Sequence, residues 1–245
     1  MNEIIFTGLC FFFIAVLYST VGHAGASGYL ATMALLSFPP DVMKPTALAL
    51  NILVALVTSI RFYTAGHFSW RLFWPFAVTS IPLAYLGGGL TVASGIYKSL
   101  VGIALLFAAA HLLMRYRESG SDNNIRLPGI IISALVGGFI GFVSGLTGVG
   151  GGIFLSPVLV IAGWAELRQT SSIAAVFILV NSVSGLAGHL QKGGTLPDNF
   201  PIWGVVVLAG GFIGASLGAT RINNPVLRVL LGIVLILAGI KMAVT

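Results

Sequence analysis

The chain has 245 residues, of which 57% are hydrophobic and only 7% are charged, and its mean hydropathy is +1.04. Soluble domains usually carry about 25% charged residues, so this composition indicates an integral membrane protein with almost no room for a soluble domain. The net charge of +6 predicts contact with anionic lipid and not with nucleic acid, because no basic run alternates with aromatic residues. The single cysteine, Cys10, excludes an intrachain disulfide.

Five apolar segments make up the first half of the chain. They cover approximately residues 3–21, 26–38, 45–64, 70–92 and 96–115. The first is interpreted as a retained helix and not a signal peptide, because it begins with Glu3 and has no basic residue. A glycine-rich break, Gly22-His23-Ala24-Gly25-Ala26-Ser27-Gly28, separates the first two segments. Pro39-Pro40 is expected to end the second segment and Pro45 to begin the third.

The second half repeats this order after a polar stretch. Its apolar segments cover approximately residues 128–146, 150–163, 169–190, 199–220 and 225–244. Its own glycine-rich break is Gly148-Val149-Gly150-Gly151-Gly152, and Trp203 and Arg228 match Trp74 and Lys98 of the first half. These matches predict an internal repeat, with a first repeat at 1–117, a cytoplasmic linker at 118–127 and a second repeat at 128–245.

The predicted fold is therefore an all-α polytopic membrane protein of two homologous halves. Each half has about five helical segments, so that 8–10 segments cross or enter the membrane. The second segment of each half is too short for an upright span of about 30 Å. The first two segments of each half are thus either two crossings or a hairpin whose glycine-rich tip lies within the membrane, and the two breaks are expected to meet near the midplane.

Charge placement predicts that the two halves are inverted relative to each other. With an odd number of crossings per half and a cytoplasmic linker, every arginine falls inside and every lysine outside, as the positive-inside rule favours. The arginines are Arg61, Arg71, Arg115, Arg117, Arg126, Arg168, Arg221 and Arg228, and the lysines are Lys44, Lys98, Lys192 and Lys241.

Aromatic residues open two equivalent segments and are expected to anchor the chain at the membrane interface. They are Trp70, Phe73 and Trp74 in the first half and Phe200 and Trp203 in the second.

Glycines of two kinds can be separated by their spacing. Gly137, Gly141 and Gly145 lie four residues apart, as do Gly210, Gly214 and Gly218, a pattern that favours close helix packing in lipid. The breaks at 22–28 and 148–152 are too dense in glycine for a helix interior. An open turn followed by a helix presents amide groups and a positive dipole end, so the breaks predict an anion site. The alternative is a tight hairpin tip that binds nothing.

The candidate substrate-binding residues lie in the breaks and on the helices beside them. They are Gly22, His23, Gly25, Ser27, Asn51, Ser144, Thr147, Gly148, Gly150, Gly151, Gly152 and Asn181. Asn51 and Asn181 are chosen because an amide donates two hydrogen bonds to an oxyanion. His23 is either a proton-coupling group or a neutral histidine that braces the turn. His67, His111 and His189 lie near segment ends and are expected at the interface.

Several kinds of function are excluded by residues that are missing from the apolar segments. No carboxylate lies at mid-membrane depth, which favours an anionic substrate over a cation. No Ser–His–Asp set, metal-ligand cluster or nucleotide-binding glycine loop is present. The sequence thus predicts no enzyme activity, no cofactor and no metal.

The second break and its surroundings resemble the signature of a known family. Gly145-Leu146-Thr147-Gly148-Val149-Gly150-Gly151-Gly152, with Ser156-Pro157 downstream, is similar to the motif of the TauE/SafE family of sulfite exporters and organosulfonate permeases. The first half departs from it, with His23 and Ala26 inside the glycine run and Leu30-Ala31 in place of Ser156-Pro157. The resemblance implies transport of sulfur-containing or small organic anions across the bacterial inner membrane.

The function expected from these observations is a permease or exporter that moves a small anion by alternating access. Sulfite, a sulfonate or a related sulfur-containing oxyanion is the expected substrate, and protons are a candidate coupling ion. The alternatives are an anion channel with the same site, or a membrane subunit that transports nothing. The sequence determines neither the direction of transport nor the oligomeric state.

Overall fold

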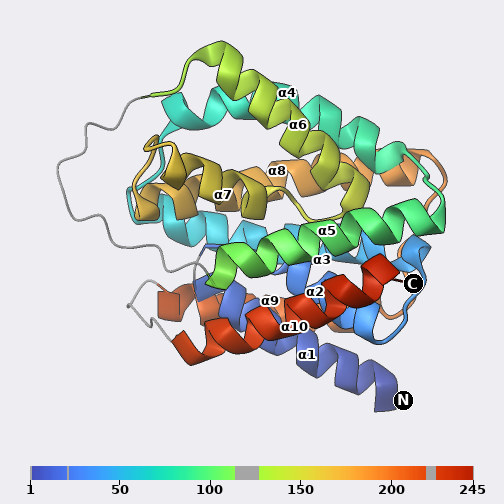
Figure 1. Ribbon diagram of the computed structural model, residues 1–245. Helices are drawn as coiled ribbons and strands as arrows, with labels where there is room; N and C mark the ends of the chain where they lie inside the picture. Colours follow the sequence, from blue (N-terminus) through green and yellow to red (C-terminus); the bar gives the residue numbers. More distant parts are fainter. Residues whose placement is uncertain (1, 21, 114–126, 219–224, 245) are drawn as a thin grey trace.

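The computed structural model describes residues 2–20, 22–113, 127–218 and 225–244 (Figure 1). All regular structure in these ranges is α-helical, as the sequence predicts. The helices are α1 (Asn2–Thr20), α2 (Ala26–Leu35), α3 (Pro40–Thr64), α4 (Trp70–Gly89), α5 (Ser94–Leu113), α6 (Ile130–Thr147), α7 (Gly152–Ile161), α8 (Leu167–Gln191), α9 (Phe200–Gly218) and α10 (Pro225–Val244). Each predicted apolar segment corresponds to one of these helices, with ends that differ by up to five residues.

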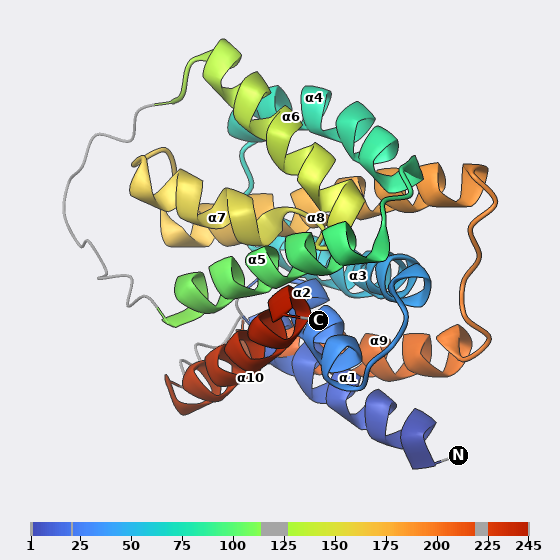
Figure 2. The same cartoon turned by 45° about the vertical axis from the view of Figure 1, so that its right-hand side comes forward.

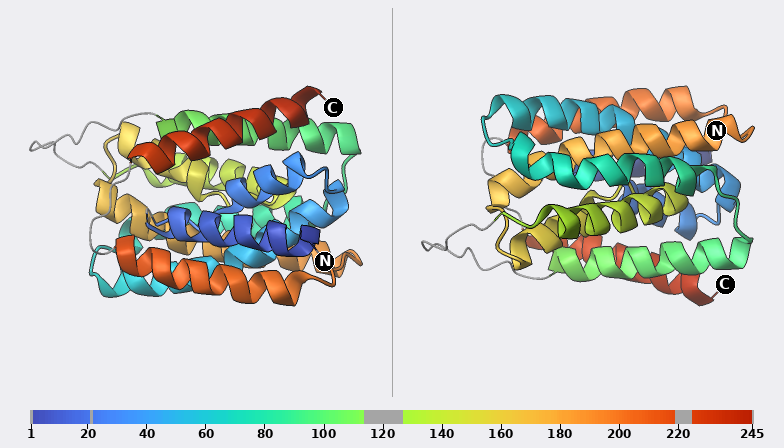
Figure 3. Two further views of the ribbon diagram at one scale, coloured as in Figure 1. Left: turned by 90° about the horizontal axis from the view of Figure 1, so that it is seen from below. Right: turned by 90° about the horizontal axis from the view of Figure 1, so that it is seen from above.

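Consecutive helices run back and forth between the two ends of one bundle (Figure 3). We call the end where α1 begins and α10 ends the terminal end, and the end where α5 finishes and α6 begins the opposite end. Helices α2 and α7 have 10 residues each, about 15 Å of helix, so they cover only half the depth of the bundle. Each of them follows a glycine-rich break that returns the chain to mid-depth.

The two halves of the chain are interleaved. Helix α1 packs against α9, and α6 packs against α4, so each half's first helix contacts the fourth helix of the other half. Helices α5 and α10 lie side by side, as do α3 and α8 (Figures 1 and 2). The directions of α1 and α6 are opposite in Figure 3, in keeping with inverted repeats, although the inversion itself stays a prediction.

The glycines spaced four apart make two of these contacts possible. A Cβ at Gly137, Gly141 or Gly145 of α6 would overlap the backbone carbonyls of Phe76, Ser80 or Ala84 on α4, respectively. On α9, a Cβ at Gly210 or Gly214 would overlap the carbonyls of Phe12 or Val16 on α1. The predicted packing role of these five glycines is therefore confirmed.

The outer surface of the bundle is apolar. On α6 alone, Ile130, Ile131, Leu135 and Phe139 are 74%, 76%, 70% and 71% exposed, which suits a surface that faces lipid. Among the described residues, six helices are long and apolar enough to cross a membrane: α1, α3, α5, α6, α8 and α9. The chain is thus a multi-pass membrane protein.

Two sequence predictions are wrong in detail. Helix α3 begins at Pro40 and not at Pro45, which lies inside the helix. Proline is favoured at the first helical position because its ring presets φ and no amide is lost there. The second error concerns the aromatic anchors. Trp70 and Trp74 are 58% and 57% exposed, as anchors should be, but Phe73 and Trp203 are buried, with exposed fractions of 3% and 1%. Trp203 packs edge-on against Phe11 and is not an interfacial anchor, because α1 covers that face of α9.

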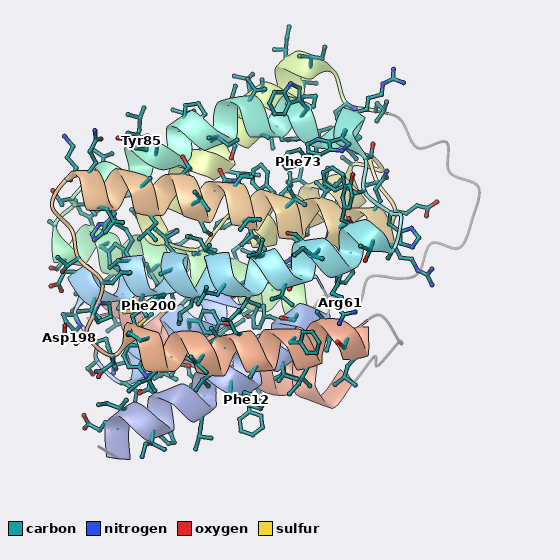
Figure 4. The ribbon with its side chains drawn as sticks, turned by 180° about the vertical axis from the view of Figure 1, so that it is seen from behind. Phe12, Arg61, Phe73, Tyr85, Asp198 and Phe200 are labelled. Carbon is teal, nitrogen blue, oxygen red and sulfur yellow. The ribbon has the colours of Figure 1, made fainter. Side chains whose placement is uncertain are left out.

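Basic residues separate between the two ends of the bundle. Arg61 lies at the opposite end and Asp198 at the terminal end (Figure 4). Lys241 is in the last turn of α10 at the terminal end, where it donates to the Leu35 carbonyl at 2.9 Å. Arg71 and Arg168 are near the start of α4 and α8, at the same end as Arg61. The predicted positions of Arg115, Arg117, Arg126 and Arg221 lie outside the described residues, as does the side chain of Arg228.

Candidate functional site

The second glycine-rich break forms an open turn between α6 and α7. Gly148, Gly150 and Gly151 have φ angles of 86°, 84° and 83°, a region that glycine adopts freely and other residues rarely do. The backbone amides of Gly150, Gly151 and Gly152 donate no hydrogen bond to any described residue. The turn therefore presents unpaired donors at the start of α7, where the helix dipole is positive.

Two polar side chains with unpaired atoms face this turn. A Cβ at Gly150 would lie 2.6 Å from Asn51 Nδ2 and 3.1 Å from Ser182 Oγ. Both side chains are fully buried, and Asn51 Oδ1 and Ser182 Oγ have no hydrogen-bond partner. Asn51 Nδ2 makes only a long bond of 3.4 Å to the Val149 carbonyl. Buried polar groups are rarely left in this state, so the arrangement suits a ligand that supplies the missing partners.

The rest of the turn is fixed by packing. Gly151 lies against the Phe177 ring and Ile140, and Gly152 lies against Ile178. The Thr147 carbonyl at the end of α6 accepts a hydrogen bond of 3.1 Å from the Tyr97 hydroxyl of α5. Because Asn51 and Ile178 are near the middle of the 25-residue helices α3 and α8, the turn is held at mid-depth in the bundle.

The first break has a similar backbone, and two tyrosine hydroxyls brace it, although Ser19 Oγ at the end of α1 is buried without a partner. Gly22 and Gly25 have φ angles of 82° and 101°. The Tyr18 hydroxyl and Ser27 Oγ are 2.8 Å apart, and the Tyr29 hydroxyl donates to the Ala24 carbonyl at 2.9 Å. The Tyr29 ring also covers Gly25, 3.0 Å from the position of a Cβ. These contacts brace the turn.

His23 joins the first break to the helix that begins at the second. Its Nε2 lies 3.1 Å from Ser156 Oγ, which itself donates to the Gly152 carbonyl at 2.8 Å. A serine hydroxyl has a single hydrogen, so while it donates to Gly152 the histidine must be the donor at Nε2. The His23 ring also packs edge-on against His111, with centroids 6.1 Å apart. His111 is thus half-buried beside the first break, in the last turn of α5, and its position at the membrane interface stays a prediction.

The structure divides the predicted site residues among three places. Around the second break lie Asn51, Ser144, Thr147, Gly148, Gly150, Gly151 and Gly152, and around the first lie Gly22, His23, Gly25 and Ser27. Asn181 is apart from both: it accepts from Ser80 at 2.5 Å and donates to the Phe177 carbonyl at 2.8 Å. Both breaks nevertheless pack against α8, Gly22 at Ser171 and Gly150 at Ile178.

Sequence reasoning missed three residues of this region. Ser182 follows Asn181, and the helix turns it to the face that meets Gly150. Tyr97 donates the hydrogen bond to the Thr147 carbonyl from α5, a helix 50 residues away in the sequence. Lys44 is 6% exposed and packs against Gly148, but it lies just outside the predicted segment 45–64, because the predicted helix begins at Pro45.

The chemistry available at the second break is that of an anion site. Within the described ranges there is no group of His, Cys, Asp or Glu that could hold a metal ion. The groups that face Gly150 are amide and hydroxyl donors, and the start of α7 adds the positive end of a helix dipole. No carboxylate oxygen is among them to repel an anion.

The whole chain matches one protein family at the sequence level. The TauE/SafE sulfite exporter family is matched over residues 7–242, which include both breaks and all ten helices in whole or in part. The chain belongs to the TauE/SafE sulfite exporter family. The family assignment and the apolar bundle together make it a membrane transporter.

Relatives of this TauE/SafE chain are named as probable membrane transporters. A protein of Sinorhizobium fredii named "Probable membrane transporter protein y4hK" is 39% identical over 98% of both chains. A "Probable membrane transporter protein" of Haemophilus influenzae is 26% identical over 87% of this chain and 83% of its own. One of Methanocaldococcus jannaschii is 27% identical over 62% of this chain and 58% of its own. No solved structure matches the chain.

Proposed function

We propose that this TauE/SafE protein carries a small sulfur-containing oxyanion, such as sulfite or a sulfonate, through the bundle by alternating access. The anion binds at the second break, at mid-depth. The amides of Gly150, Gly151 and Gly152 and the side chains of Asn51 and Ser182 bind its oxygens. The breaks and the helices beside them supply the path on either side.

One observation carries this proposal: unpaired donors converge on a glycine turn in a buried part of a membrane bundle. Ser182 Oγ is fully buried without a partner beside Gly150, and the buried Asn51 Nδ2 makes only the long bond of 3.4 Å to the Val149 carbonyl, which leaves its second hydrogen for an anion oxygen. Leaving such groups unpaired costs about 1–3 kcal/mol each. Several sulfur-bound oxygens can pair with several donors at once, as a sulfite or sulfonate requires, and the family's description as sulfite exporters supports this substrate class.

Binding of the anion is the first test. Purified protein is heated with sulfite, thiosulfate, taurine or sulfoacetate, and the unfolding temperature is compared with that in chloride. A ligand at a hundredfold excess over its dissociation constant adds about 2.7 kcal/mol to the free energy of unfolding. An upward shift with one or more of these compounds supports the proposal. No shift with any of them favours the alternative of a membrane subunit that transports nothing.

Flux separates a carrier from a channel. Protein in liposomes loaded with the binding anion should take up labelled anion faster than protein in empty liposomes, because a carrier exchanges one bound anion for another. A channel shows no such stimulation and does not saturate in the same range. Repeating the measurement with an imposed pH gradient tests whether protons are the coupling ion.

The inverted topology can be tested at two exposed sites. In a Cys10→Ala background, a cysteine at His67 reports on the opposite end and a cysteine at Asp198 on the terminal end. We expect an impermeant thiol reagent to label position 198 in intact cells and position 67 only after permeabilisation, since the arginines gather at the end that holds position 67. Labelling of both positions from outside would contradict the arrangement.

A further inference from the structure

A buried lysine lies beside the proposed anion site and has no acidic partner. Lys44, in the second turn of α3, is 6% exposed. Its Nζ donates to the carbonyls of Gly88 at 2.7 Å and Leu90 at 3.0 Å, at the end of α4. It forms no ion pair with a described residue. A charge in a membrane bundle is costly, so a lysine kept there indicates a function.

Lys44 is part of the surroundings of the second break. A Cβ at Gly148 would lie 3.1 Å from the Lys44 carbonyl and 3.5 Å from its Cγ. Asn51 lies two turns farther along α3, on the same face, and contacts the same break at Val149. One face of α3 therefore presents an ammonium group near the terminal end and an amide at mid-depth, about 10 Å apart along the helix.

A second lysine lies near Lys44 at the terminal end. The Lys192 side chain lies 3.5 Å from the position of a Cβ at Gly89, between the Gly88 and Leu90 carbonyls that accept from Lys44. The ends of α4 and α8 thus bring two lysine side chains to the same end of the bundle. A cluster of one sign of charge raises the local concentration of the opposite ion.

The first break lacks this charge. Ser171 is the fifth residue of α8, as Lys44 is of α3, and Ser171 packs against Gly22 as Lys44 packs against Gly148. The two positions are thus equivalent by place and contact, but a neutral hydroxyl replaces the ammonium group. Of these two equivalent positions, only the one beside the second break carries a positive charge.

We propose that Lys44 binds anions selectively at the terminal end of the path, from which they move to the Gly148–Gly152 turn. An ammonium group has three hydrogens, and two of them are given to Gly88 and Leu90, so the third is available to an anion oxygen. This inference rests on the proposed function, because it names a further residue of the same site. The ligand class is a small oxyanion.

The test is a comparison of Lys44→Gln with the wild-type protein in the liposome flux and unfolding measurements. Glutamine keeps two amide hydrogens for the carbonyls of Gly88 and Leu90 but has no charge. Loss of a charge-assisted hydrogen bond should raise the KM for the anion about tenfold or more, with little change in the unfolding temperature without ligand. Lys44→Arg, which keeps the charge, should lie much closer to wild type. Lys98→Gln is the matched control, because that lysine lies in the second turn of α5 at the same end and outside the site.

A lysine that merely caps α4 gives a different result. Lys44→Gln would then keep the wild-type KM, and this inference would be overturned while the proposed function stands. If the wild-type protein binds and transports none of the anions, the proposed function fails and this inference fails with it.

A measurement on the unaltered protein covers the case in which Lys44→Gln does not assemble. Amine-reactive methylation is followed by mass spectrometry with and without a saturating anion. Protection of Lys44 but not of Lys98 supports the inference. Equal modification of Lys44 in both conditions contradicts it.

Discussion

The two glycine-rich breaks share a backbone and differ in what surrounds it. In the first, the Tyr18 and Ser27 hydroxyls pair with each other and the Tyr29 hydroxyl donates to the Ala24 carbonyl, whereas Ser19 Oγ has no partner. In the second, Asn51 and Ser182 face the turn with unpaired atoms. A repeated motif thus gives one turn that is covered and braced by tyrosine side chains and one turn that polar side chains face directly. The comparison assigns anion binding to the second break and coupling or support to the first.

The largest expected effect follows from a side chain placed in the second turn. Gly150→Val should reduce transport at least about 100-fold, because valine resists a φ of 84° and its Cβ would lie 2.6 Å from Asn51 Nδ2. Flux is measured at equal amounts of protein in the membrane. Gly95→Val is the control, since a Cβ at Gly95 meets nothing within 4 Å. Normal transport by Gly150→Val would place the site elsewhere.

A glycine outside both breaks should affect assembly instead of binding. Gly214→Val forces α9 away from the Val16 carbonyl of α1, and overpacking of this kind costs about 1–3 kcal/mol. We expect less folded protein and a lower unfolding temperature, with an unchanged KM in the molecules that do assemble. A changed KM at normal stability would show that spacing does not distinguish glycines that pack helices from glycines that bind the anion.

A pair of hydroxyl deletions tests the comparison directly. Ser182→Ala removes an oxygen without a partner, so stability should hold while the KM rises by about fivefold to tenfold. Tyr18→Phe removes a paired hydroxyl, so stability should fall by about 1 kcal/mol while the KM holds. Unfolding temperature and flux are measured on both variants. The reverse outcome would exchange the roles of the two breaks.

The smallest effect is expected at His23. An ordinary histidine has a pKa of about 6.5, so if His23 carries a proton with the anion, uptake should fall as pH rises through this range. His23→Gln keeps a donor for Ser156 and has no titrating group, and its flux should be level between about pH 5.5 and 8, bracketing that value. His111 is the other titratable ring that faces His23, and His111→Gln is therefore measured in parallel. An unchanged pH profile in both variants would leave His23 as a brace.

Much of the fold could be predicted from the sequence because lipid imposes simple rules on helix length and composition. All ten apolar segments and the five packing glycines agree with the structure. Helix length and composition do not predict whether residues at equivalent positions of the two halves are buried or exposed. Trp74 and Trp203 hold equivalent places, yet one is exposed and the other is covered by α1. Burial depends on which helix packs alongside, and periodicity carries no information on that.

The site was predictable only in part, for a related reason. The backbone of the second break follows from its glycines, since few other residues allow positive φ there. Asn51 and Asn181 are equally polar and equally central in sequence, but only Asn51 reaches a break, whereas Asn181 bonds to Ser80 on α4. Ser182 lies one residue beyond Asn181 and faces Gly150. A change of about 100° around the helix for one residue decides which side chain faces the turn.

The close contact between α4 and α6 limits how the molecule can move. Three glycines of α6 lie directly on the α4 backbone, and α9 meets α1 in the same way. These pairs join helices from different halves, so residues 1–117 and 128–245 cannot swing past each other as two rigid bodies. A conformational cycle must instead divide the bundle along boundaries that cross the sequence repeat. Spin labels on α4 and α6 would then keep a constant separation through every state, while labels on α7 and α3 would not.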